Sequence, residues 1–156
     1  MKQKEFERIY QEYANTIYKV AISYMKSPAS AEDITADVFV KLLDKSPKFE
    51  NSQHEKAWLL RVTINMCKNQ LSHWSQKNLD IAAQTHLETT GIPDETSIWD
   101  EVLALPEKYK DVILLHYCEG YKTGEIAEIL ERNESTIRGH LVEARNLLKG
   151  VLENES

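Results

Sequence analysis

Hydrophobic residues recur at intervals of three and four along most of the chain, the spacing that places them on one face of an α-helix. In the first half this pattern predicts three helices, over residues 3–26, 31–44 and 57–75. Proline-containing breaks follow the first two, at 27–28 and 45–47, because the residue before a proline avoids the helical conformation. The first half of the chain is therefore predicted to form a small three-helix bundle.

Polar residues mark where the second and third helices begin. Ser30 and Asp33 have a spacing like that of a capping box, so we expect them to start the second helix. Residues 49–56, with the sequence FENSQHEK, are polar throughout most of their length. They are predicted to form a loop that leads into the third helix.

The second half of the chain begins with a change of character. Residues 77–97 show no sustained period, carry net negative charge and contain a Gly-Ile-Pro-Asp sequence. They are predicted to form a flexible linker. Beyond it we expect a short helix over 99–105 and a longer one over 106–119, with Gly120 as the C-terminal cap of the longer helix.

Two further apolar stripes, over 126–130 and 137–148, predict a helix-turn-helix. The four residues between them, 131–134, are all polar and have the length of the turn in this motif. Ser135 or Thr136 is expected to cap the second helix by accepting backbone N–H bonds. The whole pattern predicts an all-α chain of two small helical domains, over 1–76 and 98–152.

One face of the second helix of this motif is basic. Arg138, Val142, Arg145 and Lys149 fall on one line at about 100° per residue, and no acidic residue is expected on that line. Arginine binds phosphates and guanine edges, and valine can touch a thymine methyl in the major groove. The face therefore predicts contact with duplex DNA, although an ordinary solvated helix face can carry the same cations.

An aromatic side chain followed by amides and cations lies on one face of the third helix. The residues are Trp58, Arg61, Asn65 and Lys68, with Asn69 adjoining. Rings stack on bases, cations hold phosphates and amides bind base edges, so this face suits single-stranded nucleic acid. The alternative is that Trp58 belongs to the core and that the other side chains are solvated surface.

Composition and charge indicate which classes of protein the chain can belong to. The chain has 156 residues, of which 42% are hydrophobic and 28% charged, and a net charge of −6. Residues 99–156 alone carry seven basic and 12 acidic side chains. Such a domain does not hold duplex DNA tightly by counterion release alone, so any DNA binding there needs help from another component.

Neither export nor metal chemistry is indicated. No apolar run approaches the roughly 20 residues that span a bilayer, and the N-terminus has no apolar signal-peptide core, so a cytoplasmic location is expected. Cys67 and Cys118 are isolated within predicted helices and are expected to be reduced and buried. Neither has neighbours that complete a tetrahedral zinc site, so no metal or other cofactor is expected.

The layout resembles that of the small two-domain RNA polymerase sigma factors of the extracytoplasmic-function group. The resemblance covers nearly the whole chain and is carried by SAEDITADVFVKLL at 30–43, AWLLRVTINMCKNQL at 57–71, and LPEKYKDVILLHYCEGYKTGEIAEIL at 105–130 followed by ESTIRGHLVEAR. It implies a protein that is not an enzyme. Its implied partners are core RNA polymerase, through the β′ and β subunits, promoter DNA and an anti-sigma factor.

The resemblance also implies roles for individual residues. The residues implied to bind core polymerase lie on the second helix and are Asp33, Ile34, Asp37, Phe39 and Lys41. Melting and reading of the −10 promoter element, with a base flipped into a pocket, falls to the 49–56 loop and the third helix, on Asn51, Ser52, Gln53, His54, Trp58, Arg61, Asn65, Lys68 and Asn69. Reading of the −35 element falls to Ser135, Thr136, Arg138, Gly139, Val142, Arg145 and Lys149.

Several positions depart from the family pattern. Family members often have glutamine at the position of Ala36, and usually glycine and an aliphatic residue at those of Glu131 and Arg132. They often carry basic residues in place of His140 and Glu143. We expect weak intrinsic affinity for duplex DNA from these changes. Weak affinity fits a factor that binds promoters only with polymerase, and it equally fits a degenerate family member with altered specificity.

Two other classes of protein remain compatible with the sequence. One is an autonomous helix-turn-helix regulator with an N-terminal dimerisation or sensor unit, which would bind an operator without polymerase. The other is a polymerase-binding protein that no longer reads DNA.

Overall fold

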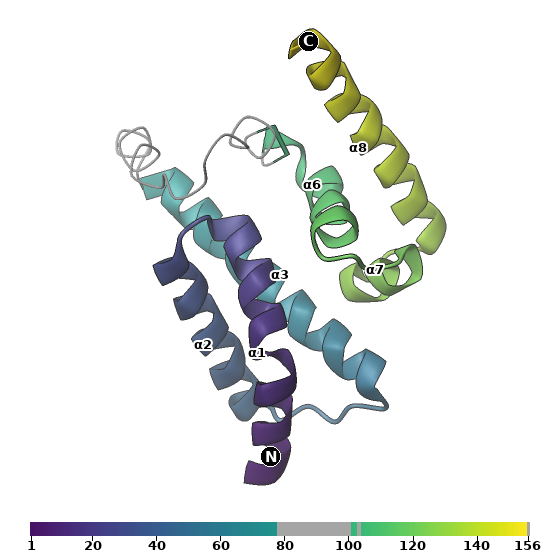
Figure 1. Cartoon of the computed structure of the whole chain (residues 1–156). Helices are drawn as coiled ribbons and strands as arrows, with labels where there is room; N and C mark the ends of the chain where they lie inside the picture. The colour runs from purple at the N-terminus through teal and green to yellow at the C-terminus, as the bar shows by residue number, and fades with distance from the viewer. Residues whose placement is uncertain (78–100, 103, 156) are drawn as a thin grey trace. The chain divides into compact units, whose positions relative to one another are not determined.

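The computed structural model describes residues 1–77, 101, 102 and 104–155 of the chain. All regular structure among these residues is helical, which confirms the predicted all-α class (Figure 1). The chain divides into two compact units, Met1–Thr89 and Thr90–Ser156. The predicted linker lies outside the described residues except for residue 77, which is helical.

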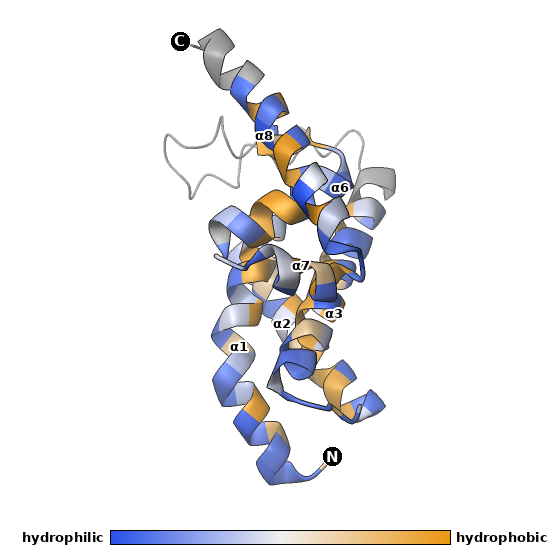
Figure 2. Cartoon of the chain, turned by 90° about the vertical axis from the view of Figure 1, so that its right-hand side faces the viewer, coloured by the Kyte–Doolittle hydropathy of each residue, from blue (hydrophilic) through white to orange (hydrophobic). Residues whose placement is uncertain are grey.

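The first unit is the predicted three-helix bundle. Helices α1 (Gln3–Met25), α2 (Pro28–Lys45) and α3 (Ser52–Lys77) run up, down and up in Figure 1. Apolar and polar residues alternate along them at helical spacing (Figure 2), because each helix buries one stripe in the core. Fully buried members of that core are Ile9, Ile17, Val20, Val38, Leu42, Leu60, Ile64 and Cys67.

The start of α2 differs from the prediction by three residues. Lys26 ends α1 in a left-handed conformation, with φ of 57°, and Ser27 is extended, as expected before a proline. The Ser27 hydroxyl accepts the Ser30 N–H at 3.4 Å, and Pro28 occupies the first turn of α2. Ser27 is therefore the cap in place of Ser30, because proline fits the first turn, where its missing N–H would have no partner.

The third helix also begins earlier than predicted. It starts at Ser52, and the side-chain oxygen of Asn51 accepts the His54 N–H at 2.8 Å. Asn51 thus acts as an N-terminal cap, and most of the predicted 49–56 loop is helical. Polar residues are common in a first helical turn, so polarity alone does not distinguish such a turn from a loop.

A bidentate ion pair ties the start of α3 to α1. The two terminal nitrogens of Arg8 donate to Glu55 Oε1 and Oε2 at 3.1 and 2.7 Å. The Glu55 side chain is 5% exposed, whereas that of Arg8 is half exposed. The Tyr13 hydroxyl adds a longer contact of 3.5 Å to the Ser52 carbonyl. The first turn of α3 is therefore fixed by α1.

The second unit contains α6 (Glu107–Ile113), a π-helical turn η1 (Leu114–Cys118), α7 (Thr123–Leu130) and α8 (Glu134–Glu155). The prediction of one regular helix over 106–119 is wrong at its end. The Glu119 N–H donates to the Leu114 carbonyl at 3.2 Å, five residues back, as in a π turn. Gly120 follows with φ of 75°, a conformation that glycine adopts without steric cost.

The short helix predicted over 99–105 is covered only in part. Residues 101, 102 and 104 are helical, whereas residues 99, 100 and 103 lie outside the described residues.

The helix-turn-helix is confirmed, with a shorter turn than predicted. Glu131 takes the left-handed conformation with φ of 55°, and the Arg132 N–H donates to the Ala127 carbonyl at 3.0 Å. Helix α8 begins at Glu134, so Ser135 and Thr136 lie inside its first turn and do not precede it. The turn therefore comprises residues 131–133.

The side chain of Arg132 anchors this turn to α6. Its terminal nitrogens lie 3.5 Å from the Lys108 carbonyl oxygen and 3.7 Å from Asp111 Oδ2. The Asp111 side chain is fully buried, so the guanidinium lies beside a carboxylate that is removed from solvent. An arginine at this position thus has a structural role within the second unit.

Replacement of Glu131 by glycine is expected to raise the free energy of unfolding of the second unit by about 1 kcal/mol. A left-handed backbone costs an L-residue about 1–2 kcal/mol, and glycine avoids most of that cost. Thermal unfolding of the full chain measures the gain. Glu128→Gly is the matched control: Glu128 is α-helical, so this change should lower stability by about 1 kcal/mol. A loss of stability in Glu131→Gly would contradict the argument.

Candidate functional site

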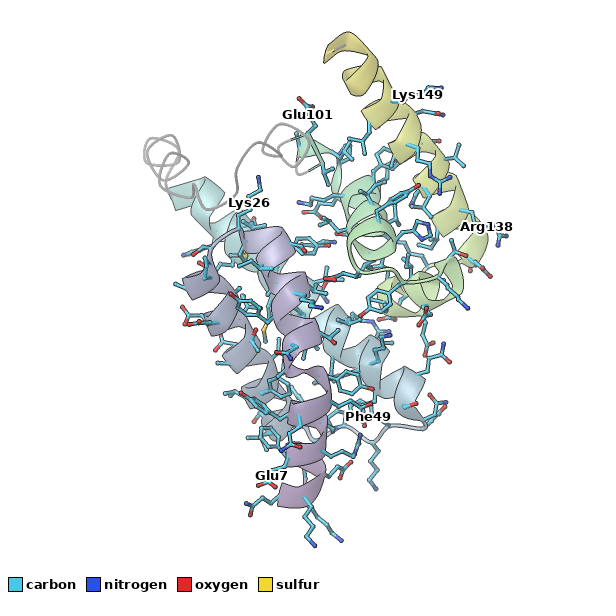
Figure 3. All side chains as sticks on the ribbon, viewed as in Figure 1. Glu7, Lys26, Phe49, Glu101, Arg138 and Lys149 are labelled. Atoms are coloured by element: carbon cyan, nitrogen blue, oxygen red, sulfur yellow. The ribbon has the colours of Figure 1, made fainter. Side chains whose placement is uncertain are left out.

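The exposed side of α8 gathers all the residues predicted to contact duplex DNA. Buried Ile137, Leu141 and Ala144 hold the opposite side of the helix in the core of the second unit. Arg138 and Lys149 project from the side of α8 that faces away from α6 (Figure 3). The exposed residues are Ser135, Thr136, Arg138, Gly139, Val142, Arg145 and Lys149.

Gly139 and Val142 give this face room for a close partner. Val142 is 53% exposed although it is apolar. A Cβ atom at Gly139 would meet nothing within 4 Å, so packing inside the chain does not require glycine there. Glycine in a helix interior costs about 1 kcal/mol relative to alanine. A requirement for close approach by another molecule would account for it.

The expected absence of acidic residues from this face is wrong. Because α8 starts at Glu134, that residue lies one turn before Arg138 on the same side, and its Oε2 is 3.3 Å from Arg138 Nη1. The same oxygen accepts a hydrogen bond from Thr123 Oγ1 at 2.8 Å. Arg138 is therefore partly neutralised by Glu134 in the free chain.

Two residues that depart from the family pattern point back towards α6. The Tyr109 hydroxyl donates a hydrogen bond to Glu143 Oε2. The ring of His140 lies edge-on to that of Tyr109, with centroids 5.6 Å apart. Among the described residues, His140 Nδ1 is buried without a hydrogen-bond partner. Glu143 and His140 thus pack the helix onto α6, which separates them from the Arg138 side.

His140 is expected to make stability depend on pH. Burial lowers its pKa from the ordinary value of about 6.5, and the positive charges of Arg132 and Lys108 lower it further, against an opposing effect of Glu143. The unfolded chain then binds more protons than the folded chain, so stability falls as the pH drops through about 6.5. Thermal unfolding at pH 7.5 and pH 5.5 should show a smaller loss for His140→Gln than for the unmodified chain. An equal loss would contradict this assignment.

Tyr117 is a side chain beside the DNA face that sequence reasoning did not identify. It is 55% exposed, and Arg145 Nε donates a hydrogen bond to its hydroxyl. Helical spacing places it four residues after Ile113 and three after Leu114, both of which are buried. Helical spacing alone therefore predicts a buried Tyr117, whereas the structure leaves it exposed within the π-helical turn.

The face predicted for single-stranded nucleic acid is gathered in part on α3. Asn65 is exposed, and Arg61 and Lys68 are half-buried on the same side of the helix. Asn51, Ser52 and Gln53 are exposed at the beginning of α3. These residues form a polar surface along the first four turns of α3, which we call the α3 surface.

Phe49 packs against both Trp58 and His54, and each of these two side chains is half-buried. The Phe49 ring lies 5.5 Å from the His54 ring and 5.8 Å from the Trp58 ring, measured between centroids (Phe49 is labelled in Figure 3). His54 Nδ1 also accepts the Glu50 N–H at 3.2 Å. Trp58 therefore packs against Phe49 and retains an exposed part.

The predicted polymerase-binding residues fall into two groups on α2. Asp33, Asp37 and Lys41 are exposed. Ile34 and Phe39 are 2% and 4% exposed, so they pack mainly inside the bundle. The difference arises because the predicted set included residues from the apolar stripe of α2, and that stripe faces the core.

A shallow groove between α2 and α3 changes the placement of Asn69. Asp37 and Lys41 line the α2 side of this groove, whereas Asn69 and His73 line the α3 side. Asn69 therefore lies beside the predicted polymerase-binding residues, at the edge of α3 that faces this groove.

Three further features concern membrane crossing, metal binding and the free thiol of Cys67. Within the described ranges, no helix is both long and apolar enough to cross a membrane. The same part of the chain brings together no group of three or more His, Cys, Asp or Glu side chains able to hold a metal ion. Burial raises the pKa of the Cys67 thiol to about 12, which keeps it protonated.

Comparison with known proteins assigns both units to one family. The family description Sigma-70 region 2 matches residues 9–76, and Sigma-70, region 4 matches residues 96–148. The ECF RNA polymerase sigma-E factor of Haemophilus influenzae is 26% identical, over 96% of this chain and 88% of that protein. RNA polymerase sigma factor SigV of Bacillus subtilis is 27% identical, over 92% of this chain and 89% of that protein.

Solved structures share the fold over nearly the full length. CnrH in complex with the cytosolic domain of CnrY has a TM-score of 0.75 at 19% identity, covering 99% of this chain and 92% of that one. The sigma factor RpoE in complex with the anti-sigma factor NepR, from Bartonella quintana, has a TM-score of 0.72 at 22% identity, covering 96% and 98%.

These matches do not favour the alternative of an autonomous regulator, because the relatives that align along nearly the whole chain are sigma factors. Both sigma-70 regions are present in the expected order, and each coincides with a helical unit. The chain therefore belongs to the sigma-70 family, as an RNA polymerase sigma factor of the extracytoplasmic-function group that directs core polymerase to promoters and initiates transcription.

Proposed function

We propose that three surfaces of this chain divide the work of promoter recognition. The exposed side of α8 reads the −35 element as duplex DNA, and the α3 surface captures unpaired bases of the −10 element. The exposed charges of α2, Asp33, Asp37 and Lys41, bind the β′ subunit of core polymerase. The strongest support is that every predicted −35 residue is exposed on one side of the second helix of the helix-turn-helix.

The acidic balance of the second unit makes core polymerase necessary for this binding. Residues 99–156 carry seven basic and 12 acidic side chains, and Arg138 is paired with Glu134. Phosphate contacts supply most of the affinity for duplex DNA, so the free chain should bind weakly. Polymerase would add contacts of its own and hold the chain on the promoter.

A gel-shift experiment tests this division of work. The probe is a promoter duplex isolated from a randomised DNA pool with core polymerase and the full chain. We expect a shifted band only when core polymerase is present with the chain. Tight binding of the same duplex by the free chain would contradict the proposal and favour an autonomous regulator.

Replacement of Glu134 by glutamine is expected to tighten binding of the promoter duplex by the holoenzyme about threefold to tenfold. The change removes a negative charge from the DNA face and releases Arg138 for a phosphate, while the amide oxygen can still accept the Thr123 hydroxyl. Equilibrium binding at fixed salt concentration measures the gain. Glu143→Gln is the control, because Glu143 is held by Tyr109 and should change binding less than about twofold. Unchanged or weaker binding by Glu134→Gln would contradict this role.

A protein inhibitor is also part of the proposal. The solved structure of CnrH contains the cytosolic domain of CnrY, and that of RpoE contains the anti-sigma factor NepR. We expect an anti-sigma protein to bind this chain in the same general manner and to prevent its assembly with core polymerase. Cross-linking of the tagged chain in its native cells, followed by mass spectrometry, tests this; a partner that leaves polymerase assembly unaffected would not be an anti-sigma factor.

A further inference from the structure

Tyr117 is an exposed aromatic residue for which neither the core nor the proposed DNA contacts provide a role. It is 55% exposed, whereas Leu114 and Leu115 of the same π-helical turn are 1% and 0% exposed. π turns occur as local insertions in helices and frequently at functional sites. The turn therefore presents one large ring to the outside while its neighbours pack in the core.

The exposed ring is fixed from two directions. Arg145 Nε donates a hydrogen bond to the Tyr117 hydroxyl, and the guanidinium carbon lies 5.4 Å from the ring centroid, beyond the hydroxyl end of the ring. The ring of His116 lies edge-on to it, with centroids 4.8 Å apart and an interplanar angle of 84°. His116 is itself held by a 3.0 Å hydrogen bond between Nδ1 and the Tyr121 carbonyl oxygen.

We propose that Tyr117 is a positioning residue that orients Arg145 for contact with the −35 duplex. This inference rests on the proposed function of α8. An arginine that is ordered before binding loses less conformational freedom when it binds. The hydrogen bond uses Nε and leaves both terminal nitrogens for bidentate contact with a phosphate or a guanine edge.

The two arginines of this face are held by different chemistry. Arg138 is paired with the carboxylate of Glu134, which opposes its charge and repels DNA phosphates. Tyr117 holds Arg145 through a neutral hydroxyl, so it orders the guanidinium without cancelling its charge. Arg145 is therefore the arginine that is ready for an anionic partner in the free chain.

A double-mutant cycle with the holoenzyme tests the inference. Binding of the selected promoter duplex is measured for Tyr117→Phe, Tyr117→Leu, Arg145→Ala and the two double variants that include Arg145→Ala. We expect Tyr117→Phe, which removes only the hydroxyl, and Tyr117→Leu each to weaken binding about threefold to tenfold. In the Arg145→Ala background neither change should have a further effect.

The cycle separates a positioning role from a structural one. If Tyr117 merely supported α8, its replacement would disturb Arg138 as well, and the loss would persist in the Arg145→Ala background; that result would overturn the inference. No loss in either Tyr117 variant would overturn it too. If Arg145→Ala has no effect, the proposed DNA role of this part of α8 fails together with the inference.

Two further measurements keep the test independent of folding. Tyr10→Phe is the matched control, because Tyr10 is 49% exposed in the first unit and lies outside the proposed DNA and polymerase contacts. It should leave binding unchanged. In the free chain, the NMR signal of the Arg145 Nε–H should exchange with water faster in Tyr117→Phe than in the unmodified chain, and an unchanged exchange rate would also contradict the positioning role.

Discussion

Replacing Asn65 and Lys68 together by alanine is expected to abolish promoter opening by the holoenzyme and to leave assembly with core polymerase intact. Both residues lie on the α3 surface, where Asn65 is exposed and Lys68 half-buried. Flipping a base out of the stack costs a few kcal/mol, which contacts to the captured base must offset. Loss of an amide and a cation from this surface should therefore reduce opening about 100-fold or more.

Permanganate reactivity of unpaired thymines measures opening, and co-elution with core polymerase measures assembly. Asn15→Ala with Lys19→Ala is the matched control, because it removes the same side-chain types from the exposed side of α1. The control should leave both measurements unchanged. Loss of core assembly in the Asn65 and Lys68 double variant would show that this surface binds polymerase instead of DNA.

Replacing Arg8 by alanine is expected to lower the free energy of unfolding of the first unit by about 2–3 kcal/mol. The change leaves the buried carboxylate of Glu55 without its bidentate partner. Breaking a buried ion pair costs about 3–5 kcal/mol, and the value is reduced here because the Arg8 side chain is half exposed. Urea unfolding of the full chain measures the loss.

Two further variants separate the buried pair from the surface charge of Arg8. Arg8 also contacts Glu12 at 3.0 Å, but that side chain is half exposed, so Glu12→Ala should cost less than about 0.5 kcal/mol. The double variant Arg8→Met with Glu55→Leu should recover much of the loss, because it leaves no buried charge. If Arg8→Ala is as mild as Glu12→Ala, the pair does not fix the start of α3.

The three helices of the first unit, the helix-turn-helix and their main apolar stripes could be predicted from the sequence because they depend on local spacing. The stripes around Ile9, Ile34 and Ile64 lie in the core as predicted. Helix starts were less accurate. Ser27 and Asn51 each cap a helix earlier than expected, because several neighbouring polar residues can serve as a cap and only the folded backbone selects one.

The candidate site was predictable to the extent that it lies on one helix face. The exposed side of α8 carries the residues expected there. On α2 the predicted set also included Ile34 and Phe39, which are buried because they belong to the apolar stripe. Helical spacing placed Asn69 next to the face of Arg61 and Asn65, and only the packing of α2 against α3 shows that it also lines the groove between these helices.

The sequence by itself determined the helical class, the helix-turn-helix and the basic stripe on its second helix, because each follows from residue spacing within one segment. Only the tertiary structure decided which charges act together. The start of α8 at Glu134 places an acid beside Arg138, and the π-helical turn places Tyr117 beside Arg145. The first result depends on the residue at which α8 begins, and the second on the packing of two segments that lie far apart in the sequence. Local periodicity specifies neither.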